Sequence, residues 1–218
     1  MRARIEEAAR AAGRDAAEIR LVAVTKGHPV EALRAALAAG LTDLGENRVD
    51  EMSGKVAELG RAAARWHMIG HVQSRKAKDA EALADWVHSV DSLKLAERLG
   101  RAATEAGRTL AVLVQVNTSG EAAKEGLTPG EAEDTVLRIA EIVGVRVEGL
   151  MTMAPLTDDE RVSGATFARL RELHGRIRAR SGAVGAELSM GMTNDLALAV
   201  REGSTMVRIG TALFGDRR

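Results

Sequence analysis

Lys26 is the residue in this sequence that most directly indicates chemistry. It follows the apolar run 19–24, and the alternation of a strand would place Val22, Val24 and Lys26 on one face. A lysine at the mouth of an apolar pocket loses hydration, which lowers its pKa and frees the neutral amine to form an imine with an aldehyde. A lysine that only ends a strand and extends into water would occupy the same position. Position alone therefore leaves both interpretations open.

Two glycine-containing segments near the C-terminus are typical of a phosphate site. They are SMGMTND at 189–195 and GTALFG at 210–215, and they offer the hydroxyls of Ser189, Thr193 and Thr211. Glycine allows backbone N–H groups to approach an anion closely. Ser189 and Thr211 could also be ordinary turn residues, so the phosphate site is a hypothesis at this point.

His67 and His71 are four residues apart, a spacing that suits zinc ligands on a helix. Here His67 falls within a strand-like run and His71 lies beyond it, so we predict no metal site. The chain contains no cysteine, which excludes disulfides, thiolate zinc sites and a cysteine nucleophile.

Short apolar runs alternate with amphipathic stretches along the chain. Several of these runs are almost continuously apolar, as expected for strands buried on both faces of a parallel sheet. The expected strands are 19–24, 41–45, 66–70, 86–90, 110–116, 146–153, 186–190 and 205–210.

Capping and turn residues mark the helices between these strands. Thr128 begins one helix, with a proline at its first position and a capping-box glutamate. Thr157 begins a second helix, which ends near Gly182, and Ser92 can cap a third. Residues 196–201 are expected to form a short helix next to the first glycine-containing segment.

Eight strand–helix alternations in one chain fit a closed α/β fold, a parallel (β/α)₈ TIM barrel, better than an open doubly wound sheet. We expect a single domain over 1–218. The strand at 205–210 ends so near the C-terminus that no helix is expected after it, and the opening helix up to Gly13 should cover that side. The carboxyl ends of barrel strands form the site, which would bring Lys26 to the two glycine-containing segments.

Charge and hydropathy exclude several classes of partner. Lys+Arg and Asp+Glu number 31 each, so no net field attracts nucleic acid or an acidic membrane. The N-terminus lacks the apolar segment of a secretory signal, and no apolar run approaches the roughly 18 residues of a membrane span. We expect a cytoplasmic protein that binds neither nucleic acid nor membrane.

Six motifs, in order and spacing, resemble the family of pyridoxal phosphate homeostasis proteins, which bind pyridoxal 5′-phosphate (PLP). They are LVAVTK, LGENRVDE, WHMIGHVQSRKAK, VNTSGEAAKEG, GLMTMAP and LSMGMTNDLALAVREGSTMVRIGTALFG. The match spans nearly the whole chain. This family is similar to the barrel domain of the alanine racemases, so the resemblance implies a fold-type III barrel with PLP as its cofactor.

The resemblance also implies roles for individual residues. Lys26 would hold PLP as a Schiff base, Asn47 would lie beside the pyridine ring, and Arg208 would face the pyridine nitrogen. The residues that would hold the phosphate are Ser189, Gly210 and Thr211.

Two of these roles have alternatives that the sequence leaves open. Asn47 could simply cap the next helix. Arg208 could be an arginine of the barrel core, paired with Glu148 or Glu187.

The resemblance further implies binding without catalysis. An arginine opposite the pyridine nitrogen disfavours its protonation, which weakens PLP as an electron sink. A racemase of the related fold takes a second base from a tyrosine of another chain, and this chain contains no tyrosine. We therefore expect no catalytic residues, and a monomer that stores PLP or delivers it to PLP-dependent apo-enzymes.

Two other functions stay open at this stage. The first is a PLP-dependent amino-acid racemase with an unusual base. The second is an aldolase or sugar-phosphate isomerase in which Lys26 acts on the substrate itself.

Overall fold

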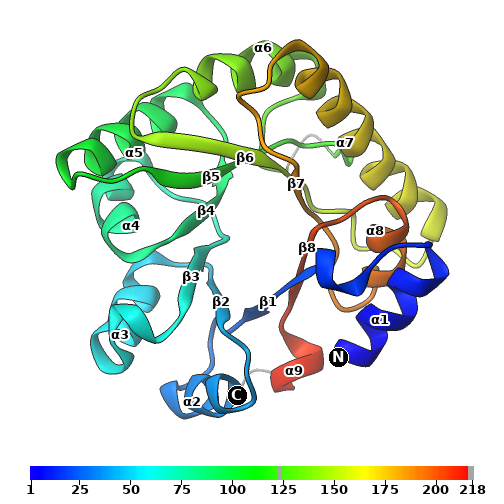
Figure 1. Ribbon diagram of the computed structural model, residues 1–218, viewed down its shortest axis with the longest axis horizontal. Helices are drawn as coiled ribbons and strands as arrows, with labels where there is room; N and C mark the ends of the chain where they lie inside the picture. The colour runs from blue at the N-terminus through cyan, green and yellow to red at the C-terminus, as the bar shows by residue number, and fades with distance from the viewer. Residues whose placement is uncertain (122–123, 216–218) are drawn as a thin grey trace.

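The computed structural model describes residues 1–121 and 124–215. Within these residues, eight parallel strands close into a barrel in which each strand pairs with the next along the chain (Figure 1). The barrel closes between β8 and β1. The strands are β1 (Arg20–Val24), β2 (Asp43–Glu46), β3 (Arg65–Met68), β4 (Trp86–Val90), β5 (Leu110–Gln115), β6 (Val145–Met151), β7 (Glu187–Ser189) and β8 (Met206–Ile209).

The predicted (β/α)₈ barrel is confirmed. Each expected strand is present, and its ends differ from the prediction by no more than two residues. The prediction for 86–90 coincides with β4. Lys26, expected to continue the strand on the same face as Val22 and Val24, instead lies in the loop after β1.

Helices surround the barrel on its outer side (Figure 1). They are α1 (Arg2–Ala11), α2 (Val30–Ala38), α3 (Val49–Leu59), α4 (Ala77–Leu83), α5 (Leu93–Glu105), α6 (Pro129–Ala140), α7 (Glu160–Arg180), α8 (Leu196–Arg201) and α9 (Thr211–Phe214). Short 3₁₀ turns lie at Ala16–Glu18, Arg61–Ala63 and Ser74–Lys76. None of the helices in the described part of the chain is long and apolar enough to cross a membrane.

The predicted helix starts are confirmed only in part. Ser92 caps α5, since its Oγ accepts a hydrogen bond from the Leu95 N–H at 3.4 Å. Thr128 is the N-cap residue of α6, but its hydroxyl bonds to the side chain of Glu131 rather than to a backbone N–H.

The expected cap at Thr157 is wrong. Asp159 caps α7 instead, and its carboxylate accepts from the Arg161 N–H at 3.0 Å. A carboxylate at a helix N-terminus also interacts favourably with the helix dipole, which a hydroxyl does not match.

The expectation of no helix after β8 is also wrong. The short helix α9 begins directly after Gly210, where the Phe214 N–H donates to the Gly210 carbonyl at 3.1 Å. Residues 122 and 123, which belong to the motif VNTSGEAAKEG, lie outside the described residues.

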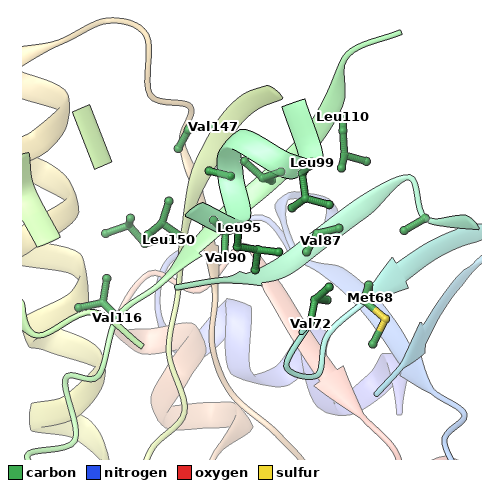
Figure 2. Close-up of a cluster of buried hydrophobic side chains, with 14 of the residues drawn as sticks. Met68, Val72, Val87, Val90, Leu95, Leu99, Leu110, Val116, Val147 and Leu150 are labelled. Carbon is green, nitrogen blue, oxygen red and sulfur yellow. The ribbon is translucent and has the colours of Figure 1, made fainter. Parts of the chain in front are cut away.

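The main hydrophobic core fills the layer between the barrel and the helices. Figure 2 shows part of it, where Leu95 and Leu99 of α5 meet Val87 and Val90 of β4. These four side chains are buried. Removing apolar surface from water, at about 25 cal/mol per Å², holds the helices against the strands.

The opening helix covers the side of the barrel where β8 meets β1, as predicted. Ile5, Ala8 and Ala9 of α1 are buried in one cluster with Leu196 and Val200 of α8. This packing holds α8 in place beside the loop that follows β7.

The interior of the barrel is partly polar. A small apolar cluster of Leu113, Met151 and Met206 occupies part of it. Other positions are taken by ionisable side chains, among them His67 and His88, both fully buried. A barrel interior is usually packed with branched apolar side chains, so these polar residues need an explanation.

Candidate functional site

A cavity of about 570 Å³ opens at the carboxyl ends of the strands. The segments that follow β1, β2, β3, β6, β7 and β8 contribute to its walls. Of the six residues singled out from the sequence, those that line it are Lys26, Asn47, Arg208, Gly210 and Thr211. The fold therefore brings together residues that are up to 185 positions apart, from Lys26 to Thr211.

Lys26 is half-buried, and the backbone on both of its sides is held from α3. The Thr25 carbonyl accepts a hydrogen bond from Lys55 Nζ at 2.7 Å. The Gly27 N–H donates to Glu51 Oε1 at 2.6 Å. These two bonds fix the loop that carries Lys26 relative to the barrel.

Lys55 itself is the centre of a buried ionic cluster beneath this loop. Its Nζ lies 2.7 Å from Glu46 Oε1 and 2.7 Å from Glu51 Oε1. Glu46 is fully buried, and burial raises its pKa, opposed by the bonds from Lys55 and Thr25. Glu46 directly precedes Asn47 in the sequence. The same cluster therefore supports both Lys26 and Asn47 at the cavity wall.

Asn47 presents an unsatisfied polar atom at the cavity wall. Its Oδ1 is buried and has no hydrogen-bond partner among the described residues. The alternative role as a helix cap is wrong, because the N-cap residue of α3 is Arg48. A Cβ on Gly70 would come within 2.3 Å of the Asn47 carbonyl oxygen, so this glycine allows the loop after β3 to pack against Asn47.

Arg208 is buried in the floor of the cavity and bound on two sides. Its Nη1 donates to Ser189 Oγ at 2.7 Å, and its Nη2 donates to the Thr152 carbonyl at 3.0 Å. Burial lowers the pKa of Arg208 to about 10, with the charge of Asp195 opposing the shift. A pKa of about 10 still leaves the guanidinium charged at neutral pH.

The alternative pairing of Arg208 with a core acid is wrong. Glu148 pairs with Arg146, and Glu187 lies 3.6 Å from Arg20. None of the ion pairs among residues 1–121 and 124–215 involves Arg208. Its charge is therefore held by neutral acceptors and by the more distant Asp195.

Ser189 does not line the cavity. Its side chain is fully buried behind Arg208, where its Oγ accepts from Arg208 and lies 3.0 Å from His88 Nδ1. Gly210 and Thr211, the other predicted phosphate residues, do line the cavity. Of the three predicted phosphate residues, Ser189 is therefore the one whose side chain lies outside the cavity wall.

The loop after β7 adopts a backbone that requires glycine. Gly191 has a φ of +95°, and a Cβ on it would lie 2.4 Å from the Ala199 Cβ of α8. Next to it, the Met192 N–H donates to Asp195 Oδ1 at 2.5 Å. This turn brings Met192 and Thr193 to the cavity wall.

Sequence reasoning assigned no role to several other wall residues. Ile69 and Leu156 line the cavity, as does His28, whose ring lies 5.1 Å from that of Phe214. All three follow the observed strands β3, β6 and β1. Their position near strand ends was the available signal, but their residue types do not indicate ligand binding.

The two histidines with zinc-like spacing lie in different places. His67 is inside the barrel, bonded to Asp43 and His88, whereas His71 is more exposed and lies 3.1 Å from Asp91. In the described ranges, no cluster of three His, Cys, Asp or Glu residues could hold a metal ion.

Comparison with known proteins connects this geometry to a family. The family model described as the alanine racemase N-terminal domain matches residues 1–218. The pyridoxal phosphate homeostasis protein of Pseudomonas aeruginosa is 46% identical over 216 residues, which cover 99% of this chain and 92% of that protein.

Solved structures with similar folds include a relative of the same family and a more distant enzyme. PipY of Synechococcus elongatus, whose structure was solved with PLP bound, is 39% identical with a TM-score of 0.85, over 97% of this chain and 100% of that chain. Alanine racemase of Clostridium difficile, at 16% identity, shares the fold with a TM-score of 0.79 over 99% of this chain and 56% of its own.

Proposed function

This chain belongs to the family of pyridoxal phosphate homeostasis proteins, and we propose that it binds PLP in the cavity at the carboxyl ends of its strands. The observation that carries the proposal is the convergence of Lys26 and the buried, charged Arg208 on one cavity. PLP supplies, when bound, an aldehyde that condenses with an amine and a pyridine ring that withdraws electrons.

The residues of the cavity fit the polar groups of PLP. Lys26 offers the amine for covalent attachment. The unsatisfied Oδ1 of Asn47 marks a position where a ligand group would restore a hydrogen bond, since a buried polar atom without a partner costs roughly 1–3 kcal/mol. Gly210 and Thr211 offer a backbone approach and a hydroxyl to the phosphate.

Arg208 supports binding without turnover. Its guanidinium can only donate hydrogen bonds, and its charge repels a proton on a nitrogen that it faces. A pyridine nitrogen at Arg208 would stay unprotonated, so the ring would withdraw electrons weakly. We therefore propose a protein that stores PLP, delivers it to apo-enzymes and limits free aldehyde in the cytoplasm, acting as a monomer.

Reconstitution with PLP tests binding and attachment. We expect a visible absorbance band that borohydride removes, and a reduced adduct that mass spectrometry finds on the peptide containing Lys26. A protein that takes up no PLP under saturating conditions would refute the proposal.

A second measurement tests the absence of catalysis. Incubation of the PLP-loaded protein with single L-amino acids, followed by chiral chromatography, is expected to show no sustained turnover. Continued formation of a D-amino acid would instead identify a racemase.

A further inference from the structure

A chain of hydrogen bonds crosses the polar interior of the barrel and ends at Arg208. Asp43 Oδ1 lies 2.9 Å from His67 Nε2, and His67 Nδ1 lies 2.9 Å from His88 Nε2. His88 Nδ1 lies 3.0 Å from Ser189 Oγ, which accepts from Arg208 Nη1 at 2.7 Å. The five side chains come from β2, β3, β4, β7 and β8 and are all buried.

The two ends of this chain determine the direction of every bond in it. Arg208 can only donate, and the Asp43 carboxylate can only accept. With neutral imidazoles, His67 must donate from Nε2 to Asp43, so its Nδ1 carries no proton and accepts from His88 Nε2. His88 Nδ1 then carries no proton either, and it accepts from the Ser189 hydroxyl, whose oxygen accepts from Arg208.

The surroundings keep both imidazoles neutral. Burial lowers the pKa of His67 and of His88, and the nearby charges of Arg20 and Arg208 lower the pKa of His88 further. Burial raises the pKa of Asp43, but its bond with His67 and the charges of Arg65 and Arg20 outweigh this, so the pKa lies below the usual value. If His67 carried a charge, the bonds between it and Ser189 would reverse.

We propose that His88, His67 and Asp43 are positioning residues for Arg208. They orient the Ser189 hydroxyl so that its lone pair faces Arg208. Together with the Thr152 carbonyl, this leaves the remaining N–H groups of the guanidinium for a ligand in the cavity. The inference rests on the proposed function, in which the ligand of Arg208 would be the pyridine nitrogen of PLP.

The direction of the chain can be tested without any cofactor. In cofactor-free protein with ¹⁵N-labelled histidine, long-range ¹H–¹⁵N correlation at neutral pH reports the tautomer of each ring. We expect the Nε2–H form for both His67 and His88, assigned by single substitutions. His174 is an internal reference, because its Nε2 lies 2.8 Å from the Gly185 carbonyl and must donate. An Nδ1–H form or a charged ring at His67 or His88 would overturn the proposed direction.

Substitutions at His88 test the positioning role. His88→Leu removes the acceptor for Ser189, whereas His88→Asn can offer its Oδ1 near the position of Nδ1. We expect the dissociation constant of PLP to rise about five- to tenfold in His88→Leu, and most of that loss to be recovered in His88→Asn. The pH titration of the bound cofactor's absorbance should shift in His88→Leu as well.

His174→Leu is the matched control, because it removes another buried histidine that does not belong to this series of hydrogen bonds. If His88→Leu does not fold, Ser189→Ala removes the same bond from the other side with a smaller change in volume, and the same loss is expected. Unchanged affinity and an unchanged titration in His88→Leu or Ser189→Ala would overturn the positioning role. If the wild-type protein bound no PLP, the proposed function would fail. The histidine tautomers, measured without cofactor, would still show the direction of the hydrogen bonds.

Discussion

Lys26 and Arg208 reach one cavity because the strands that carry them close the barrel. In the pairing of β1 with β8, Arg208 lies opposite Val22, shortly before the loop with Lys26. The two side chains lie in different surroundings. Arg208 is buried and hydrogen-bonded in the floor, and Lys26 is half-buried on a loop. This arrangement suits a ligand that Arg208 orients by hydrogen bonding and Lys26 attaches through its amine.

Replacing Lys26 should separate attachment from binding. In Lys26→Ala we expect the visible absorbance of bound PLP and its sensitivity to borohydride to disappear, because no amine remains in reach of the aldehyde. Some PLP should still bind through non-covalent contacts, measured by equilibrium dialysis. Lys76→Ala, which removes a lysine of the 3₁₀ turn Ser74–Lys76 paired with Asp50, is the control and should keep the wild-type spectrum. A wild-type spectrum in Lys26→Ala would show that another group attaches PLP.

Replacing Arg208 should change the protonation of the cofactor. In Arg208→Gln the repulsive charge is lost, so the pyridine nitrogen should take up a proton at higher pH. The absorbance of the PLP-loaded variant, followed across pH, is expected to show this shift. Arg171→Gln, which removes a surface arginine paired with Glu202, should titrate like the wild type. Identical titration curves for Arg208→Gln and the wild type would exclude contact with the ring nitrogen.

At the scale of elements, α3 supports the ends of two strands, β1 and β2, as well as covering β2. Lys55 on its inner side connects α3 to the ends of both β1 and β2 through the Thr25 carbonyl and Glu46. Glu46 Oε2 is buried and has no partner among the described residues, so Glu46 depends on Lys55 for compensation of its charge. The loop with Lys26 and the segment with Asn47 are therefore supported by one ion cluster.

Breaking this cluster should destabilise the fold. Lys55→Met leaves Glu46 buried without its cation, and we expect the free energy of unfolding to fall by about 3–5 kcal/mol. The double variant Lys55→Met/Glu46→Gln should recover part of this loss, because no unpaired charge is left. Urea unfolding of the three proteins measures both effects. A loss below about 1 kcal/mol in Lys55→Met would show that the cluster is not needed to stabilise the fold.

The turn between β7 and α8 can be tested by two glycine substitutions. Gly191→Ala combines an unfavourable positive φ with a clash against Ala199, and should cost about 1–3 kcal/mol and weaken PLP binding. Gly54→Ala in α3, where a Cβ would contact nothing within 4 Å, should stabilise the protein by about 0.5–1 kcal/mol. Thermal or urea unfolding compares the two. Equal effects in both variants would contradict the role of the Gly191 conformation.

At the scale of the whole molecule, the barrel carries neutral histidines in its interior and beneath its helices. Burial lowers the pKa of His67, His88 and His174 below 6.5. Below that pH the unfolded chain takes up protons that the folded chain does not. The free energy of unfolding must therefore fall as the pH falls from 6.5 towards the lower folded pKa values.

This pH dependence is measurable. We expect each of the three histidines to contribute up to about 1.4 kcal/mol per pH unit in that window. Urea unfolding of the cofactor-free protein at about pH 7.5 and about pH 5.5 gives the difference. His174→Asn should reduce the slope by the share of one histidine. A stability that is flat across this range would show that these histidines are not neutral in the folded state.

The sequence by itself determined the barrel and the place of its site. The apolar pattern of strands and helices and the glycines at their ends involve residues close together in the sequence. β4 and α8 were therefore predicted at their observed bounds. Lys26 was predicted at a strand end near the two glycine-containing segments. Contacts across the barrel could not be predicted in the same way. His88 and Ser189 are 101 residues apart, and only closure of the sheet brings them within hydrogen-bond distance. Tertiary structure alone therefore decided that Ser189 lies behind Arg208 and that buried histidines connect it to Asp43.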